Sequence, residues 1–353
     1  MKPLPCQTNV VVPRSLLKRR LVGALALTSV AVSTLASSKS GHMLSDGTLT
    51  SRYIDFSVFD RSTGRSIGVR VRLPAEKKPS AVILYSPGLG SGLSNGSAWC
   101  DAWQAAGYVV VNLSHPVTNE SIWETGHVSF QDNLKKALAP EQYAFRVKDC
   151  SRVLTHCIND PVLTKYIDPG RIGIAGHSYG ALTVQAIAGQ SVGGQDLRDN
   201  RIRAAIALSP SASSLERARL MSNVTIPFFS ITGDQDQFVT FRDGSSTMRL
   251  GTSLDKRLQI YQQLPVGSKQ LLILSDADHM TFAGEPVDPS RFSRDVKTSL
   301  DQQRLQWERV SKMSQEFWQY YLAEPKQSDQ QTRSNFQQKL RLSQAIGDQL
   351  KFD

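Results

Sequence analysis

The chain has 353 residues, of which 40% are apolar and 20% charged, so it can bury a sizeable core and has an ordinary globular composition. Its formal net charge of +10 first indicates a nucleic acid or a membrane surface as a partner. Five of the positive charges, however, lie in residues 1–36, which contain no acidic residue, and removing them leaves 10 − 5, or +5. Because the remainder has no block of like charge, the sequence does not favour nucleic-acid binding.

Residues 1–36 have the pattern of a cleavable export signal. A basic start ends at Arg19-Arg20, an apolar run follows over residues 21–35, and small residues surround Ala36. A membrane anchor is the alternative, but the apolar run is only about 16 residues long and is rich in Ser, Thr and Gly. We therefore expect an exported protein, periplasmic or secreted, with no stable membrane span after signal removal. The paired arginines leave the twin-arginine and general export routes both open.

Three cysteines remain beyond the predicted signal: Cys100, Cys150 and Cys157. Their spacing fits no zinc-binding pattern, so no metal site is expected from them. Cys150 and Cys157 lie two helical turns apart, about 10 Å, which is too far for a direct disulfide. A disulfide from Cys100 to one of the others and three buried thiols are both compatible with the sequence. His115 and His127 also lack a metal-binding partner pattern and are expected to lie in a loop that covers the functional site of the protein.

Predicted strands and helices alternate along the rest of the chain. Residues 53–59 and 66–73 are expected to form an antiparallel strand pair at the start of the sheet. Buried strands are expected over residues 81–85, 108–113, 171–175, 202–208, 226–231 and 271–274, and helices over residues 97–107, 145–158, 181–188 and 300–322. This alternation predicts an α/β fold with a mainly parallel central sheet and helices on both faces.

Residues 37–323 are expected to form a single domain, followed by a tail. From residue 324 onward the composition becomes Gln-rich and polar. Phe336, Leu340 and Ile346 have the spacing of an amphipathic helix, but a partly disordered polar tail over residues 324–353 is favoured.

The sequence Gly176-His177-Ser178-Tyr179-Gly180 indicates a catalytic serine. It directly follows an apolar strand and directly precedes a small-residue helix, as a nucleophile elbow requires. The glycines leave room for neighbouring backbone, and the helix directs its positive end at the serine oxygen. A second match, Gly92-Leu93-Ser94-Asn95-Gly96, is separated from its preceding strand by a glycine-rich loop. We therefore predict that Ser178 is the nucleophile and that Ser94 is a loop residue.

A serine nucleophile needs a base and an acid, and in the fold that carries this elbow they follow the serine in the order acid, then histidine. His279 is the only histidine after Ser178, and it follows the last predicted strand, so it is the expected base. The preceding strand leads into Asp234 and Asp236. Asp236 lies deeper in the loop and is preferred as the acid, whereas Asp234 can cap the turn; the residues alone leave both open.

A glycine-rich loop after the first buried strand, Ser86-Pro87-Gly88-Leu89-Gly90, is suited to an oxyanion hole. Fixed backbone N–H groups stabilise the negative charge that forms on a carbonyl oxygen during acyl transfer. We expect these donors to be the backbone N–H groups of Leu89 and Tyr179.

Together with Gly233-Asp234-Gln235-Asp236 and Asp278-His279-Met280-Thr281-Phe282, these motifs resemble the α/β-hydrolase superfamily over about residues 53–322. The chain is most similar to the predicted dienelactone-hydrolase and platelet-activating-factor-acetylhydrolase-like group, with bacterial cutinase-like polyester hydrolases more distant. The resemblance implies ester or lactone hydrolysis through an acyl-enzyme, and it supports Asp236 as the acid. Two positions depart from the family: Ser178 replaces the cysteine of true dienelactone hydrolases, and Ser86-Pro87-Gly88 replaces the His-Gly common in acetylhydrolases.

The sequence thus predicts a serine carboxylic-ester hydrolase with the triad Ser178, His279 and Asp236 and without a metal or organic cofactor. Its substrate would be a small-molecule or polymer ester. Four aromatic residues are expected to line the substrate pocket: Trp99, Trp103, Phe238 and Phe282. Two alternatives stay open, namely an amidase or peptidase with the same triad and a catalytically silent binding protein with the same fold.

Overall fold

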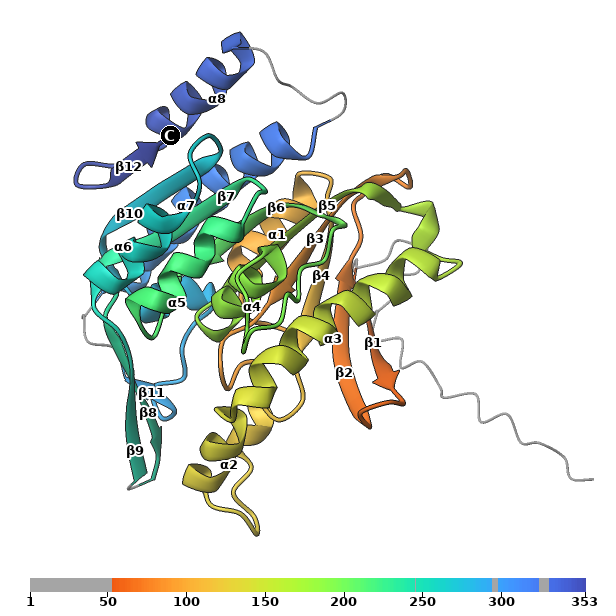
Figure 1. The fold of residues 1–353 in the computed structure, drawn as a ribbon, viewed down its shortest axis with the longest axis vertical. Coiled ribbons are helices and arrows are strands. Elements are labelled where there is room, and N and C mark those ends of the chain that lie inside the picture. Colours follow the sequence, from red (N-terminus) through yellow and green to blue (C-terminus); the bar gives the residue numbers. More distant parts are fainter. Residues whose placement is uncertain (1–52, 245, 294–297, 324–329) are drawn as a thin grey trace, which may run out of the picture. The chain divides into compact units, whose positions relative to one another are not determined.

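A nine-stranded sheet runs through the part of the chain that the computed structural model describes, which comprises residues 53–244, 246–293, 298–323 and 330–353 (Figure 1). The predicted export signal over residues 1–36 lies outside these ranges. The strands are, in their order across the sheet, β1 (Tyr53–Asp60), β2 (Arg65–Arg72), β4 (Val109–Ser114), β3 (Ser80–Ser86), β5 (Ile167–His177), β6 (Ile202–Leu208), β7 (Phe228–Gln235), β10 (Lys269–Asp278) and β12 (Gln349–Phe352).

The six central strands, from β4 to β10, are parallel to one another, and the predicted α/β architecture is confirmed. β1 and β2 form the expected antiparallel pair at one edge, and β2 is also antiparallel to β4. Strands buried on both faces need apolar residues at every position. In β3, for example, Ile83 and Tyr85 pack into the core on one face of the sheet, whereas Val82 and Leu84 pack into the core on the other.

Helices cover both faces of this sheet. They are α1 (Ser97–Ala105), α2 (Phe130–Ala137), α3 (Pro140–Asn159), α4 (Tyr179–Ala188), α5 (Leu215–Arg219), α6 (Leu254–Gln263), α7 (Leu300–Tyr321) and α8 (Gln330–Leu342). α3, α4, α5 and α6 contribute to the core on one face, and α1, α7 and α8 contribute to the core on the other (Figure 1). Within the described ranges, no helix is both long enough and apolar enough to cross a membrane.

Two local differences from the predicted elements have simple causes. α3 begins at Pro140 rather than at residue 145, because proline is well suited to the first turn of a helix, where its missing N–H is not needed. α2 lies in a segment for which no helix was predicted, and Ser129 begins it by accepting a hydrogen bond from the Asp132 N–H. A small second sheet, formed by β8 (Phe238–Asp243), β9 (Ser246–Gly251) and β11 (Phe292–Ser293), was also not predicted.

The C-terminal segment is part of the folded domain, so the prediction of a polar tail is wrong for residues 330–353. Phe336 and Leu340, one helical turn apart on α8, are buried against the same core cluster as α7. β12 then pairs antiparallel with β10 and forms the last strand of the sheet. The sequence favoured a disordered tail because only a few apolar residues make these contacts, and most of the other residues of the segment are polar.

Replacement of Phe336 with alanine tests this assignment. The Phe336 ring stacks on Tyr320 at a centroid distance of 4.5 Å and is 4% exposed. We expect the free energy of unfolding to fall by about 3 kcal/mol, because the substitution leaves a cavity in the core. Denaturant unfolding measures the change. The control is Ile346→Ala at a fully exposed position, which should change stability by less than about 0.5 kcal/mol. Equal small effects of both substitutions would contradict the assignment.

The three cysteines that the structure describes are free and buried, which decides between the two alternatives in favour of buried thiols. Burial raises the pKa of Cys100 to about 12 and that of Cys157 to about 12. The thiolate is the reactive form, so these side chains are expected to be chemically inert.

Candidate active site

Ser178 lies at the junction between β5, which ends at His177, and α4, which begins at Tyr179. Its backbone has φ 55° and ψ −112°, a conformation that a residue with a side chain rarely adopts. Strain of this kind persists only where the surrounding structure enforces it. Here the Ser178 N–H donates a hydrogen bond to the Leu208 carbonyl oxygen of β6 at 3.0 Å, which holds the turn against the sheet.

The two glycines of the motif are required by close packing. A Cβ atom at Gly180 would lie 1.9 Å from the Ser86 carbonyl oxygen, and one at Gly176 would lie 2.6 Å from the Gly180 carbonyl oxygen. These contacts are with backbone atoms, which cannot move away without shifting β3 or α4. The glycine spacing therefore allows the first turn of α4 to approach the end of β3. Ser94 of the second motif is exposed and lies on a turn, as expected.

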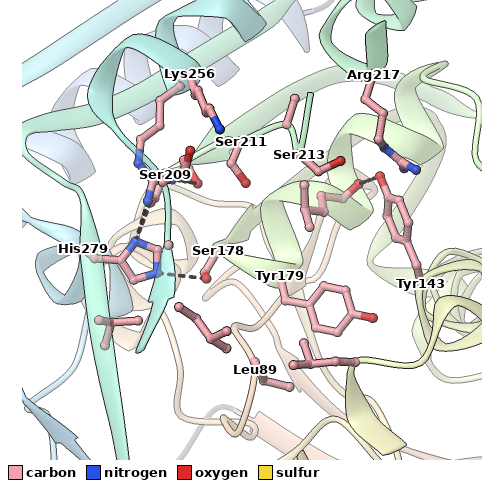
Figure 2. A pocket seen from close by; sticks show the side chains of 18 of the residues that line it. Leu89, Tyr143, Ser178, Tyr179, Ser209, Ser211, Ser213, Arg217, Lys256 and His279 are labelled. Carbon is pink, nitrogen blue, oxygen red and sulfur yellow. Dashed lines mark hydrogen bonds between the residues drawn. The ribbon is translucent and has the colours of Figure 1, made fainter. Parts of the chain in front are cut away.

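His279 follows β10 and begins the 3₁₀ helix η4 (His279–Ala283). Its Nε2 lies 2.9 Å from Ser178 Oγ (Figure 2). Its Nδ1 lies 2.9 Å from Asp236 Oδ1. With the proton on Nδ1 donated to the carboxylate, Nε2 is free to accept the proton of the serine hydroxyl. Asp278 caps η4 by accepting a hydrogen bond from the Thr281 N–H at 2.9 Å. The cap fixes the start of the helix and so the position of the imidazole.

Asp236, and not Asp234, is the carboxylate that contacts His279. Asp236 is fully buried and accepts hydrogen bonds from Ser209 Oγ at 3.0 Å and Thr232 Oγ1 at 2.8 Å. Burial by itself would raise the pKa of this carboxyl. The adjacent Arg257 charge and the hydrogen bonds from His279 and Ser209 outweigh that effect and hold the pKa well below its usual value.

The Asp234 side chain has a different environment. Burial, together with the nearby Asp276 carboxylate, raises the pKa of Asp234. This shift disfavours the ionised form, which the acid of a triad needs in order to stabilise a histidine cation. Geometry and electrostatics therefore both distinguish the two aspartates in the same direction.

Sequence reasoning missed Arg257 and Ser209, which complete this end of the site. Arg257 Nη2 lies 3.0 Å from Asp236 Oδ1, and its Nε donates to the Asp236 carbonyl oxygen at 2.8 Å. Ser209 Oγ lies 2.8 Å from His279 Nδ1. Ser209 directly follows β6, and the ends of parallel strands form one edge of a sheet, so its position could have indicated proximity to the site. Arg257 lies in a polar helix that gave no such signal.

The two expected oxyanion donors lie beside Ser178. Tyr179 is the first residue of α4, so its N–H has no acceptor within the helix. Leu89 lies in the loop after β3, between Gly88, whose N–H donates to Asn95 Oδ1 at 3.3 Å, and Gly90, whose N–H donates to the Thr118 carbonyl oxygen at 2.9 Å. Leu89 and Tyr179 both line the pocket that contains Ser178 and His279 (Figure 2).

That pocket has a volume of about 640 Å³. Most of its wall is apolar, and the polar exceptions include serines and the cationic side chains of Arg217 and Lys256 (Figure 2). The apolar lining residues include Leu89, Leu138, Leu182, Val239, Phe241 and Leu250. A pocket of this size and composition is typical of a site for a small organic ligand.

None of the four aromatic residues that were expected to line the pocket does so, and that prediction is corrected. Trp99, Trp103 and Phe282 are fully buried in the core cluster that α1 and α7 form on the opposite face of the sheet. The Phe238 ring instead stacks against the Arg249 guanidinium, whose Cζ lies 4.4 Å from the ring centroid. Side chains alternate along a strand, so in β8 it is Val239 and Phe241, one residue out of phase with Phe238, that reach the pocket.

No group of three or more His, Cys, Asp or Glu side chains in the described ranges is arranged to hold a metal ion. When the chain is compared with known proteins, no family model matches it, and no curated protein sequence matches it significantly.

Proposed function

We propose that the protein is a serine hydrolase, and more specifically a carboxylic-ester hydrolase of the α/β-hydrolase fold that works through an acyl-enzyme. The observation that carries the proposal is the hydrogen-bonded line from Ser178 through His279 to Asp236, with 2.9 Å at each step and with the serine opening into a pocket. A buried serine or an isolated histidine would not combine these features. Geometry and roles, rather than sequence position, identify such a triad.

The topology supports the proposed fold. The nucleophile lies between a central parallel strand and the helix that follows it, and the acid and the histidine come after β7 and β10, in that order along the chain. All three groups therefore reach the carboxyl edge of the sheet from separate strands. The antiparallel start formed by β1 and β2, followed by six parallel strands, is compatible with this fold as well.

In the proposed mechanism, Ser178 Oγ attacks the carbonyl carbon of the ester while His279 Nε2 takes its proton. The N–H groups of Leu89 and Tyr179 stabilise the negative oxygen of the tetrahedral intermediate. The imidazolium, stabilised by Asp236, then protonates the leaving alcohol and leaves an acyl group on Ser178. His279 next activates a water molecule, which hydrolyses the acyl-enzyme and restores the serine.

The substrate that best fits this site is a small-molecule or polymer ester with an apolar acyl group, because the pocket wall is mainly apolar. The predicted export signal favours a periplasmic or secreted location for the reaction. Apart from the water molecule that hydrolyses the acyl-enzyme, the side chains and the backbone supply all the groups that this mechanism uses.

The function is tested by assaying protein that begins at Ser37 against p-nitrophenyl esters from acetate to palmitate, with organophosphate labelling in parallel. We expect turnover, an optimum acyl length that reflects the pocket, and covalent labelling of the peptide that contains Ser178. The matched control is Ser94→Ala, which removes the serine of the second motif and should leave both results unchanged. Labelling with turnover of amides alone would favour an amidase or peptidase. Absence of both turnover and labelling would contradict the enzyme proposal in favour of a binding protein.

A further inference from the structure

A fully buried arginine, Arg146 of α3, lies behind the loop that is proposed to form the oxyanion hole. Its guanidinium donates hydrogen bonds to Thr183 Oγ1 at 3.1 Å, Thr118 Oγ1 at 2.6 Å and Ser86 Oγ at 3.0 Å, and also to the Pro87 carbonyl oxygen. These acceptors belong to α4, to the segment after β4 and to the end of β3. One planar group thus joins three elements that meet at the active site.

All four of these acceptors are neutral oxygens, although a buried cation is normally paired with a carboxylate. The nearest acidic side chain in the network, Asp149, is already bound by Arg65 Nη2 at 2.7 Å and by His115 Nδ1 at 2.9 Å. Burial lowers the pKa of Arg146 to about 10, so the guanidinium still carries its charge at neutral pH. A buried charge of this kind is costly, which favours a role beyond packing.

His115 and Ser86 continue the network in a second Ser–His–Asp arrangement. Ser86 Oγ lies 3.0 Å from His115 Nε2, and Asp149 binds the other ring nitrogen. Burial and the Arg146 charge lower the pKa of His115 to about 4, so the ring is neutral near pH 7. Ser86 is not a nucleophile, because it is fully buried and already accepts a hydrogen bond from Arg146. The expectation that His115 lies in a loop over the site is wrong, because its ring is fully buried and contacts Ser86 and Asp149.

Arg146 and the residues that it binds contact the backbone next to Leu89 and both the ring and the backbone of Tyr179, the two proposed oxyanion donors. Leu89 lies between Pro87, whose carbonyl oxygen Arg146 binds, and Gly90, whose N–H donates to the backbone of Thr118. Tyr179 is held from two sides: the Arg146 guanidinium lies 4.6 Å from its ring centroid, and Thr183 Oγ1 donates to its carbonyl oxygen at 3.1 Å.

We propose that Arg146 is the positioning residue of the oxyanion hole, fixing the Leu89 and Tyr179 N–H groups in the orientation that the transition state requires. The inference rests on the proposed hydrolase function. Arg146 does not line the substrate pocket, so it has no direct part in substrate binding. Donors that are fixed before the reaction stabilise the charge that develops in the transition state and contribute little to ground-state binding. Loss of Arg146 is therefore expected to lower kcat with little change in KM.

The test compares Arg146→Met and Arg146→Lys with wild type, using kcat per active site titrated with a fluorophosphonate, so that unfolded molecules do not count. We expect Arg146→Met to lower this kcat by about 100-fold, the loss typical of a small misplacement at a reacting centre. Its affinity for a trifluoromethyl ketone, which forms an oxyanion with Ser178, should fall in parallel, while KM stays within about twofold. Arg146→Lys should recover little of the lost kcat, because one ammonium group cannot bind four separated oxygens.

Two further variants separate positioning from folding. Arg72→Met is the matched control, since Arg72 is also buried but binds Asp101 and Asn112 away from the pocket. It should lower the melting temperature and leave kcat per titrated site unchanged. If Arg146→Met does not yield folded protein, Thr118→Val decides, with an expected loss in kcat of roughly tenfold because one hydrogen bond of the guanidinium is removed.

Unchanged kcat per site in Arg146→Met, full recovery in Arg146→Lys, or unchanged kcat in Thr118→Val would each overturn the positioning role. A fall in kcat with no change in affinity for the trifluoromethyl ketone would also overturn it. In all these cases wild type still hydrolyses esters and is still labelled. Absence of turnover and labelling in the wild-type protein would overturn the proposed function itself, so the two failures are distinguishable.

Discussion

Replacement of Ser178 with alanine is expected to lower kcat for ester hydrolysis by about 10⁶-fold, the order of magnitude known for the nucleophile of a serine triad. Ser178 Oγ is the only atom of the proposed triad that forms a covalent bond to the substrate. In the attack on the ester, His279 Nε2 takes the proton of this hydroxyl, 2.9 Å away. The fold should persist, because the substitution keeps the backbone N–H that donates to the Leu208 carbonyl oxygen. Turnover of a p-nitrophenyl ester and thermal unfolding of both proteins measure the two effects.

The effect of the substitution should not add to that of removing the base. Without Ser178 no acyl-enzyme forms, so His279 has no step of this mechanism left to assist. The double variant Ser178→Ala, His279→Ala is therefore expected to be no slower than Ser178→Ala alone. A measurable activity that remains in Ser178→Ala and is lost in the double variant would point to another nucleophile that uses the same histidine. Activity equal to wild type in Ser178→Ala would contradict the triad.

The parts of the site that the sequence revealed are those that local spacing determines. Gly176 and Gly180 each lie two residues from the serine, and the structure shows that backbone contacts at both positions exclude a side chain. The order Ser178, Asp236, His279 could be predicted because parallel strands bring their carboxyl ends to one edge of the sheet. The same principle predicts that residues directly after strands will meet, although it does not say which of two neighbouring aspartates turns toward the histidine.

The pocket wall could not be predicted, because an aromatic residue carries no mark of the face on which it will be buried. Trp103 donates a hydrogen bond to Ser314 of α7 at 2.8 Å, a partner that no local pattern reveals. β8 was not predicted, so the sequence did not show that Val239 and Phe241 would reach the pocket while Phe238 lies on the other face of the strand.

The arginines behind the site were missed for a related reason. Arg146 and Arg257 are almost completely buried, yet both occur in helices whose sequences resemble solvated, polar helices. Their partners include backbone carbonyl oxygens from distant parts of the chain, such as those of Pro87 and Ser209. Tertiary contacts of this kind override local composition. The C-terminal strand β12 was missed in the same way, since it is stabilised by pairing with β10.

Replacement of Asp236 with asparagine is expected to lower kcat by about 10⁴-fold, because the amide favours the wrong tautomer of His279. An amide N–H directed at Nδ1 would place the ring proton on Nε2. Nε2 could then no longer accept the proton of Ser178. The substitution also leaves the buried Arg257 without its carboxylate at 3.0 Å, so we expect a loss in stability of about 3 kcal/mol at neutral pH. Steady-state kinetics and denaturant unfolding measure the two effects.

The loss in stability of Asp236→Asn depends on pH, and the sign of this dependence follows from the pKa of Asp236. The pKa of Asp236 is lower in the folded protein than in the unfolded chain, so ionisation of Asp236 stabilises the fold at neutral pH. This stabilisation declines as the pH falls below about 4, the usual pKa of an aspartate in an unfolded chain. The difference in stability between wild type and Asp236→Asn should therefore narrow in acid. Asp234→Asn is the matched control and should change kcat by less than about tenfold, because its side chain does not contact His279. A larger loss in Asp234→Asn than in Asp236→Asn would reverse the assignment of the triad acid.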